Sequence, residues 1–216
     1  MKIDEALPLL KNCVGKSFRE LFADLPIDLR TNKGNVGQLL LLKIGLPLDS
    51  NLKDFDDGEL KTNKSDKNGA PLETMFITQI SQQIDTLLSK DPLPFEQSHL
   101  FEKISRLVFL PVFRDAENRG DWYFVDLLDC DLRKNNALKI QLEQDYYDIC
   151  EQLKQHIKNS DDGCIHTSNG EFIQIRSKDS KPYRPIFSKI YNKYISNKNH
   201  AFYFKKDFMN YIRNLK

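Results

Sequence analysis

The sequence contains no apolar run that approaches the roughly 20 residues needed for a membrane-spanning helix. The four consecutive leucines at 39–42 are long enough only for a helix core. The first residues carry an acidic pair, Asp4 and Glu5, and lack the small-residue cleavage site of a signal peptide. These absences predict a cytoplasmic protein that makes no use of a membrane.

Cysteine is also scarce, with 4 residues in 216 and no Cys-x-x-Cys pair. Scattered cysteines disfavour a metal cluster or a disulfide framework and indicate buried or idle thiols. Gly34 and Gly37 are not followed by the Lys-Ser/Thr of a phosphate-binding loop. The sequence has no helix-turn-helix or zinc-finger pattern either, so the common nucleotide-binding and DNA-binding motifs do not account for its function.

The net charge of +1 hides a strong asymmetry along the chain. Residues 171–216 hold 11 Lys/Arg and 3 Asp/Glu, a net charge of +8. The other 170 residues hold 21 basic and 28 acidic side chains, a net charge of −7. A basic C-terminal quarter on an acidic body is typical of a polyanion-binding surface, although a solvated lysine-rich helix would have the same composition.

Hydrophobic periodicity predicts helices and strands in mixed order within one large domain. We expect helices over residues 3–14, 17–25, 36–44, 95–105, 137–157, 187–195 and 206–215. We expect strands over residues 59–62, 73–80, 106–114, 122–128, 171–176 and 202–204. The polar segments 64–70, 82–93, 116–120 and 177–185 are expected to be loops. This order favours an α/β domain with a mixed sheet flanked by helices.

The stretch KDFDDGELKTNK gathers acidic residues immediately before a predicted strand. Residues two apart in a strand point to the same side, so Glu59 and Lys61 would project together while Leu60 faces the core. A turn at Gly58 could bring the Asp54 carboxylate back beside Glu59. Two carboxylates and a backbone carbonyl suit Mg²⁺, which prefers oxygen ligands. The pattern alone also fits a solvated acidic turn, so both interpretations stay open at this point.

Six segments, in order, carry a resemblance to a known family: LPIDLRTNKGNVGQLL, KDFDDGELKT, NGAPLETMFI, FEQSHLFEKISRLVFLPV, GEFIQIRSK and FYFKKDF. Together they resemble the MutH family of GATC-directed DNA endonucleases, which includes mismatch-repair proteins and related type II restriction enzymes. The matches run from about residue 14 to residue 211, which is nearly the whole chain.

The resemblance implies the PD-(D/E)xK restriction-endonuclease-like fold over residues 1–216, with two lobes around a DNA cleft. The catalytic lobe would cover about residues 1–110, and the DNA-recognition lobe about residues 111–216. It also implies roles for individual residues. Asp54, Glu59 and the Leu60 carbonyl would bind the metal, Lys61 would be the catalytic lysine, and Lys103 a second functional lysine. Contacts to DNA are implied for Lys33, Arg176, Lys178, Tyr203 and Lys205.

The activity implied is Mg²⁺-dependent hydrolysis of a phosphodiester at or near GATC in double-stranded DNA, with Mn²⁺ as a substitute ion. A mismatch-repair nickase would act as a monomer with a MutL-type activator. A restriction enzyme would cut both strands, in some cases as a transient dimer. Neither charge nor motifs separate these two roles.

The chain departs from the family pattern at three places. Leu41 stands where the family usually has a Glu that supplies a further acid near the metal. The turn between Asp54 and Glu59 is two residues shorter than in the mismatch-repair members, which leaves Asp56 and Asp57 as alternatives that would share or replace the role of Asp54. Ser177 replaces a usual Pro beside the recognition arginine. The Leu41 departure supports an alternative, a DNA-binding protein of the same fold with weak or no catalytic activity.

Overall fold

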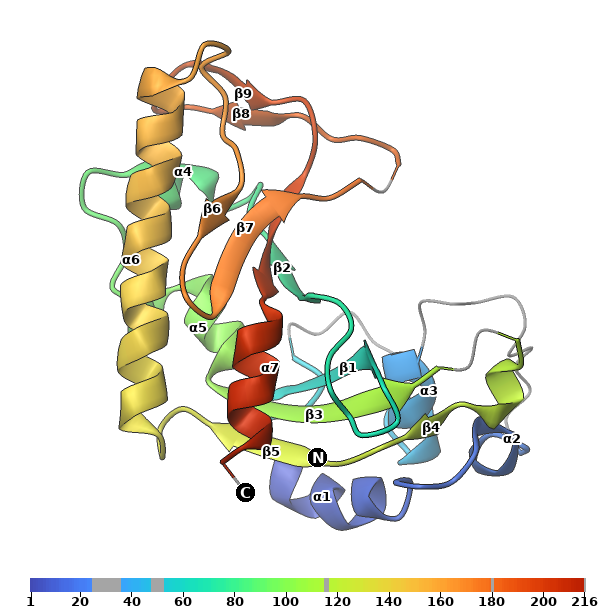
Figure 1. Ribbon diagram of the computed structural model, residues 1–216. Helices are drawn as coiled ribbons and strands as arrows, with labels where there is room; N and C mark the ends of the chain where they lie inside the picture. The colour runs from blue at the N-terminus through green and yellow to red at the C-terminus, as the bar shows by residue number, and fades with distance from the viewer. Residues whose placement is uncertain (25–35, 48–52, 115–116, 180, 216) are drawn as a thin grey trace. The chain divides into compact units, whose positions relative to one another are not determined.

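The computed structural model describes residues 1–24, 36–47, 53–114, 117–179 and 181–215 (Figure 1). None of the described helices combines the length and the apolar character required to cross a lipid bilayer. All four cysteines are free thiols: Cys13, Cys130 and Cys150 are buried, and Cys164 is partly exposed. Burial raises the pKa of both Cys130 and Cys150 to about 12, which keeps these thiols protonated and unreactive.

The chain forms two compact units, each built from segments that alternate along the sequence. The first unit comprises residues 1–73, 105–131 and 209–216, and the second comprises residues 74–104 and 132–208. The expected lobes, about 1–110 and 111–216, are continuous in sequence, whereas the units exchange segments at residues 74, 105, 132 and 209. Helix α7 (Lys206–Arg213) starts in the second unit and ends in the first.

A four-stranded mixed sheet forms the centre of the first unit. Strand β1 (Glu59–Ser65) runs parallel to β3 (Arg106–Phe113), the apolar run that was predicted as a central strand. Strands β4 (Tyr123–Phe124) and β5 (Leu128–Asp131) pair antiparallel with successive parts of β3. The predicted mixed sheet is confirmed, but the strand expected over 122–128 is divided into two because the chain leaves the ladder between β4 and β5.

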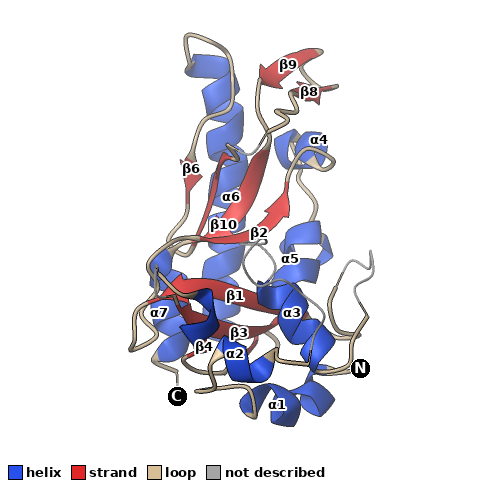
Figure 2. Cartoon of the chain, turned by 90° about the vertical axis from the view of Figure 1, so that its right-hand side faces the viewer, coloured by secondary structure: helices blue, strands red, loops and turns tan. Residues whose placement is uncertain are grey.

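Three helices bury their apolar faces in the first unit: α1 (Ile3–Lys11), α2 (Phe18–Leu21) and α3 (Val36–Lys43). Helix α2 begins at Ser17, whose hydroxyl accepts a hydrogen bond from the Glu20 amide while the Glu20 carboxylate accepts one from the Ser17 amide. This capping box explains why a four-residue helix is stable at this position. Figure 2 shows α3 beside β1, with which it packs.

The second unit contains an antiparallel sheet in the order β2 (Met75–Gln79), β10 (His200–Phe204), β7 (Ile173–Ser177), β6 (Ser168–Asn169). The 24-residue helix α6 (Asn136–Asn159) packs against β6 and β7. Its Asp145 is almost fully buried and accepts hydrogen bonds from the amides of residues 171, 172 and 173, at 2.8, 2.7 and 3.1 Å. A buried carboxylate therefore fixes the start of β7 to the helix.

Shorter helices complete the second unit: α4 (Ile84–Leu88), the 3₁₀ helix η1 (Phe95–Gln97) and α5 (His99–Ile104). Helix α4 lies in the segment expected to be a polar loop, so that expectation is wrong there. Its three buried residues, Ile84, Leu87 and Leu88, have the i, i+3, i+4 spacing of a helix face. A second 3₁₀ helix, η2 (Arg119–Asp121), belongs to the first unit.

The helix predicted over 187–195 is wrong, because this segment is a hairpin of β8 (Ile186–Ser188) and β9 (Lys193–Ser196). Asn192 adopts a left-handed conformation with φ of 49° at the turn, which a helix cannot include. The Asp85 carboxylate on α4 accepts hydrogen bonds from the Ser188 hydroxyl and the Lys189 amide, at 2.7 and 3.0 Å. A contact across 103 residues of sequence therefore overrides the local helical spacing.

Candidate active site and DNA-reading surface

The acidic stretch ahead of β1 forms a tight turn. The Phe55 amide donates a hydrogen bond to the Gly58 carbonyl at 3.0 Å, which reverses the chain. A Cβ atom at Gly58 would lie only 2.5 Å from the Arg106 carbonyl oxygen, so this position requires glycine. The turn brings Asp54 back to β1, where its Oδ2 accepts a hydrogen bond from the Leu60 amide at 3.0 Å.

Arg106, at the start of β3, forms ion pairs that fix the same turn. Its guanidinium is 4% exposed and lies 2.7 Å from Asp57 and 3.3 Å from Asp129. It also contacts Asp4 on α1 at 2.5 Å. Burial acts to lower the pKa of Arg106, but its hydrogen bonds to Asp4 and Asp129 outweigh burial and raise the pKa. The turn is therefore fixed to both α1 and β3 by one charged side chain.

Glu59 and Lys61 project from the same side of β1, as their spacing predicts. The Lys61 amine donates to Glu59 Oε1 at 2.8 Å, and the two side chains are only 13% and 7% exposed. Leu60, between them, is buried in the core of the first unit. Two opposite charges with so little exposure stabilise each other, and removing either would destabilise the other buried charge.

The oxygen atoms around Asp54 are suitable ligands for a hard cation. Among the described strands, β1 pairs only with β3, and the Leu60 amide points away from β3 toward Asp54. The amide and carbonyl of one strand residue point to the same edge, so the Leu60 carbonyl lies on the Asp54 side of β1. Within the described ranges, no three His, Cys, Asp or Glu side chains converge as metal ligands. Mg²⁺, which keeps several waters, needs no more than two carboxylates and a carbonyl, so these residues fit it.

The alternative acids of the turn are engaged elsewhere. Asp57 accepts a hydrogen bond from the Ile3 amide at 2.8 Å in addition to its pair with Arg106. Asp56 pairs with the amino group of Met1 at 3.1 Å. These contacts give both residues structural roles and favour Asp54 as the acid nearest the edge of β1.

Leu41 occupies a buried position on α3 and belongs to the apolar core of the first unit. A Cβ at Gly37 would lie 3.9 Å from Thr62 Oγ1 on β1, so this side of α3 faces that strand. Leu41 follows Gly37 by one helical turn and shares its side of the helix. The position that departs from the family pattern therefore faces the strand that carries Glu59 and Lys61.

Lys103 lies on α5 in the second unit, and its catalytic role stays a prediction. His99, on the same helix, has its Nε2 3.1 Å from the Thr78 hydroxyl of β2, which ties the helix to that strand. Lys33 lies outside the described residues.

Three of the predicted DNA-contacting residues gather on one face of the second sheet. The Arg176 guanidinium lies 4.5 Å from the centre of the Tyr203 ring, and the Lys178 amine lies 4.8 Å from that of Phe76. Phe76 and Tyr203 meet edge to face at 5.7 Å. We name Arg176, Lys178, Tyr203 and Phe76 the reading face. Phe76 was not predicted, although its alternation with buried Met75 and Ile77 could have indicated an outward position.

Lys205 differs from the other predicted contacts. Its amine donates a hydrogen bond to the Gly170 carbonyl at 3.0 Å, at the turn between β6 and β7. The lysine therefore braces this turn, and its contact with DNA stays a prediction.

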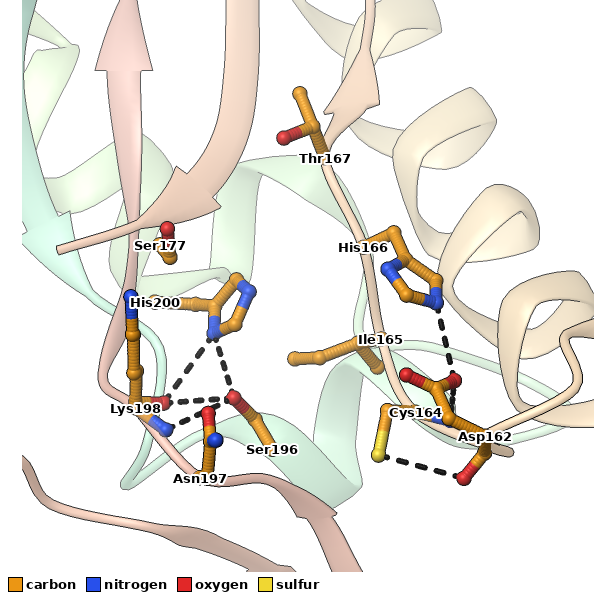
Figure 3. A pocket seen from close by; sticks show the side chains of 10 residues that line it. All are labelled: Asp162, Cys164, Ile165, His166, Thr167, Ser177, Ser196, Asn197, Lys198 and His200. Atoms are coloured by element: carbon orange, nitrogen blue, oxygen red, sulfur yellow. Dashed lines mark hydrogen bonds and ion pairs between the residues drawn. The ribbon is translucent and has the colours of Figure 1, made fainter.

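A hollow of about 600 Å³ in the second unit is bordered by Ser177, Lys198, His166 and His200 (Figure 3). Ser177 alternates with Arg176 and Lys178 along the chain, so the hollow lies on the opposite side of β7 from the reading face. The His200 ring is largely buried, and its Nδ1 contacts the Ser196 hydroxyl at 3.2 Å. Burial lowers the pKa of His200, which keeps the imidazole neutral near pH 7.

Comparisons with known proteins show what the whole chain is similar to. No protein-family model matches the sequence. A DNA mismatch repair protein MutH from Vibrio vulnificus (strain YJ016) is 36% identical over 120 residues, which are 52% of this chain and 51% of that protein. The protein of the same name from Haemophilus influenzae (strain 86-028NP) is 32% identical over 117 residues, 51% of this chain and 50% of that protein. The MutH of Shewanella amazonensis is 29% identical over 194 residues, 82% of this chain and 77% of that protein.

The chain spans about half the length of the Vibrio vulnificus MutH proteins that it matches. The longer alignment to the Shewanella protein extends the similarity over most of the chain. The chain is therefore similar to MutH proteins over most of its length, and these similarities support its membership of the MutH family.

Proposed function

We propose that this protein is a Mg²⁺-dependent DNA endonuclease that hydrolyses a phosphodiester bond at or near GATC. The observation that carries the proposal is the arrangement at the edge of β1. There, Asp54 is hydrogen-bonded to the Leu60 amide, and Glu59 is paired with Lys61. Similarity to DNA mismatch repair proteins supports DNA as the substrate.

Asp54, Glu59 and the Leu60 carbonyl would hold the Mg²⁺ ion. When bound, the ion stabilises negative charge on the phosphate and lowers the pKa of a coordinated water. The Lys61 amine, 2.8 Å from Glu59, is suited to orient the attacking water or to neutralise charge that develops on the phosphate. Because the Lys61 side chain is only 13% exposed, little solvent screens its charge, and its electrostatic interaction with the phosphate is stronger.

The reading face would contact the recognition sequence. Arginine can donate two hydrogen bonds to the O6 and N7 atoms of guanine, and Arg176 is positioned by its contact with Tyr203. Burial raises the pKa of Tyr203, so its hydroxyl stays protonated and can donate to a phosphate or a base edge.

Plasmid cleavage in the presence of Mg²⁺ tests the proposal. Glu59→Gln and Lys61→Ala should each abolish cutting, while Lys64→Ala, three residues along the same strand, should retain it. Because Glu59 and Lys61 are nearly buried, the unfolding midpoint and DNA affinity of each variant must be measured as well. Cutting by both variants at the native rate would refute the proposed active site.

The biological role divides between strand nicking in mismatch repair and double-strand cutting in restriction. A repair nickase would need a MutL-type activator, so addition of MutL and MutS should stimulate nicking of unmethylated DNA. Double-strand cutting that these proteins leave unchanged would favour restriction.

Leu41 favours a second candidate function, DNA binding without efficient cleavage. An aliphatic side chain cannot ligate a cation or accept a proton, and this one is buried against β1. Salt-sensitive binding of GATC duplexes without Mg²⁺-dependent cutting would support this candidate.

A further inference from the structure

The β8–β9 hairpin and its flanks have an unusual composition. Residues 181–206 contain seven Lys/Arg and no Asp/Glu. Four aromatic residues alternate with these cations between residues 181 and 198. None of the hairpin residues belongs to the reading face. Cationic and aromatic side chains in alternation are typical of surfaces that bind nucleic acids.

The apolar side chains of the hairpin point outward. Phe187 is 42% exposed on β8, Tyr194 is 66% exposed on β9, and Ile190 is 52% exposed at the turn. Phe187 and Tyr194 are cross-strand partners whose rings meet edge to face at 5.2 Å. On the opposite face of the hairpin, Ile186 and Ile195 are buried. The hairpin therefore has an inner face that is buried and an outer face that is aromatic and exposed. Figure 1 shows the hairpin at one end of the second unit.

Charge around this outer face is predominantly positive. Lys189 is exposed at the turn that follows β8, and Lys193 is exposed on β9. Of the acids near the hairpin, Asp85 accepts hydrogen bonds from the turn amides, Asp162 accepts one from the Cys164 amide at 2.9 Å, and Asp179 pairs with Lys198 at 2.8 Å. A polyanion would therefore meet positive charge on this face.

The turn is held rigidly. Asp85 accepts hydrogen bonds from the amides of Lys189 and Ile190 and from the Ser188 hydroxyl. These bonds fix the strands that present Phe187 and Tyr194, so little conformational entropy would be lost when they contact a ligand.

We propose that the β8–β9 hairpin is a second DNA-binding element, which contacts duplex outside the recognition sequence without reading bases. Lys189 would neutralise a phosphate, and the Phe187–Tyr194 pair would pack against deoxyribose. A two-stranded β-ribbon has dimensions that the major groove of B-DNA admits. The inference rests on the proposed function, since it assigns the same DNA to an additional surface.

Fluorescence anisotropy with labelled duplexes tests the inference, using duplexes with and without GATC that extend well beyond a recognition sequence. Lys189→Gln should lower the slope of log affinity against log salt by about 1 on both duplexes. Tyr194→Ala should weaken binding about fivefold on both, at the low end for aromatic contacts with nucleotides. Helix α6 of the same unit offers matched controls, Lys158→Gln for the exposed lysine and Ile140→Ala for the exposed apolar residue. Neither control should change affinity or salt slope.

Hairpin variants that bind like their matched controls would overturn the inference and leave the proposed function intact. A change in self-association of Tyr194→Ala, measured by sedimentation, with unchanged DNA binding would also overturn it and identify a protein-binding face. Failure of the native chain to bind any duplex would instead refute the proposed function itself.

Discussion

Arg106 is the residue whose removal should damage the first unit most through electrostatics. Its guanidinium is 4% exposed and pairs with Asp57, Asp129 and Asp4, which are 24%, 33% and 76% exposed. Arg106→Met keeps an unbranched side chain of similar length but leaves these carboxylates without their cation. Breaking a buried ion pair costs about 3–5 kcal/mol in free energy of unfolding. Because the acids are partly solvated, we expect the lower end, about 3 kcal/mol.

Thermal and urea unfolding followed by circular dichroism measure this effect. A loss of about 3 kcal/mol corresponds to a fall in melting temperature of roughly 6–12 °C for a chain of this size. Arg19→Met is the matched control, because the Arg19–Asp121 pair has a similar distance of 3.0 Å but side chains that are 67% and 57% exposed. That variant should lose no more than about 1 kcal/mol. Equal stabilities of the two variants would refute the argument that Arg106 fixes the acidic turn.

Three further predictions concern other buried groups. Leu41→Glu places a carboxylate in the core. Because burying an ion carries a desolvation penalty of several kcal/mol, the variant should lose about that much free energy of unfolding. Mg²⁺ should restore more of that loss, and more cleavage, in Leu41→Glu than in Leu41→Gln; equal responses would show that this position is remote from the metal. Asp145→Asn should lose about 3 kcal/mol in urea unfolding, because the charged acceptor of three backbone amides is replaced by a neutral one. The lowered pKa of His200 means that the unfolded chain takes up its proton first, so native stability should fall as the pH drops below about 6.5. His200→Gln should show a smaller fall between pH 7.5 and 5.5, and an identical fall would exclude His200 as the source.

The elements predicted well from sequence are those whose signal is local. The apolar run at β3 and the long amphipathic repeat of α6 each bury enough surface to fix their own structure. The hairpin at β8 and β9 was mispredicted because its apolar residues have helical spacing. Its conformation depends on Asp85, a partner that no local window contains. Periodicity alone cannot supply such a contact.

The candidate site shows the same division. The side of β1 shared by Glu59 and Lys61 follows from strand geometry, and the structure confirms their contact. The return of Asp54 depends on the Gly58 turn, whose close packing against Arg106 is a tertiary contact. The separate structural role of Asp57 was missed for the same reason, since Arg106 lies 49 residues further along the chain.

The central claim is that a divalent ion binds at the edge of β1. Anomalous diffraction from crystals of the native chain soaked with Mn²⁺ tests it most directly. The account predicts a manganese peak about 2.1 Å from oxygen atoms of Asp54, Glu59 and the Leu60 carbonyl, and its loss in Glu59→Gln. Ordered density for both carboxylates with no manganese between them would contradict the account.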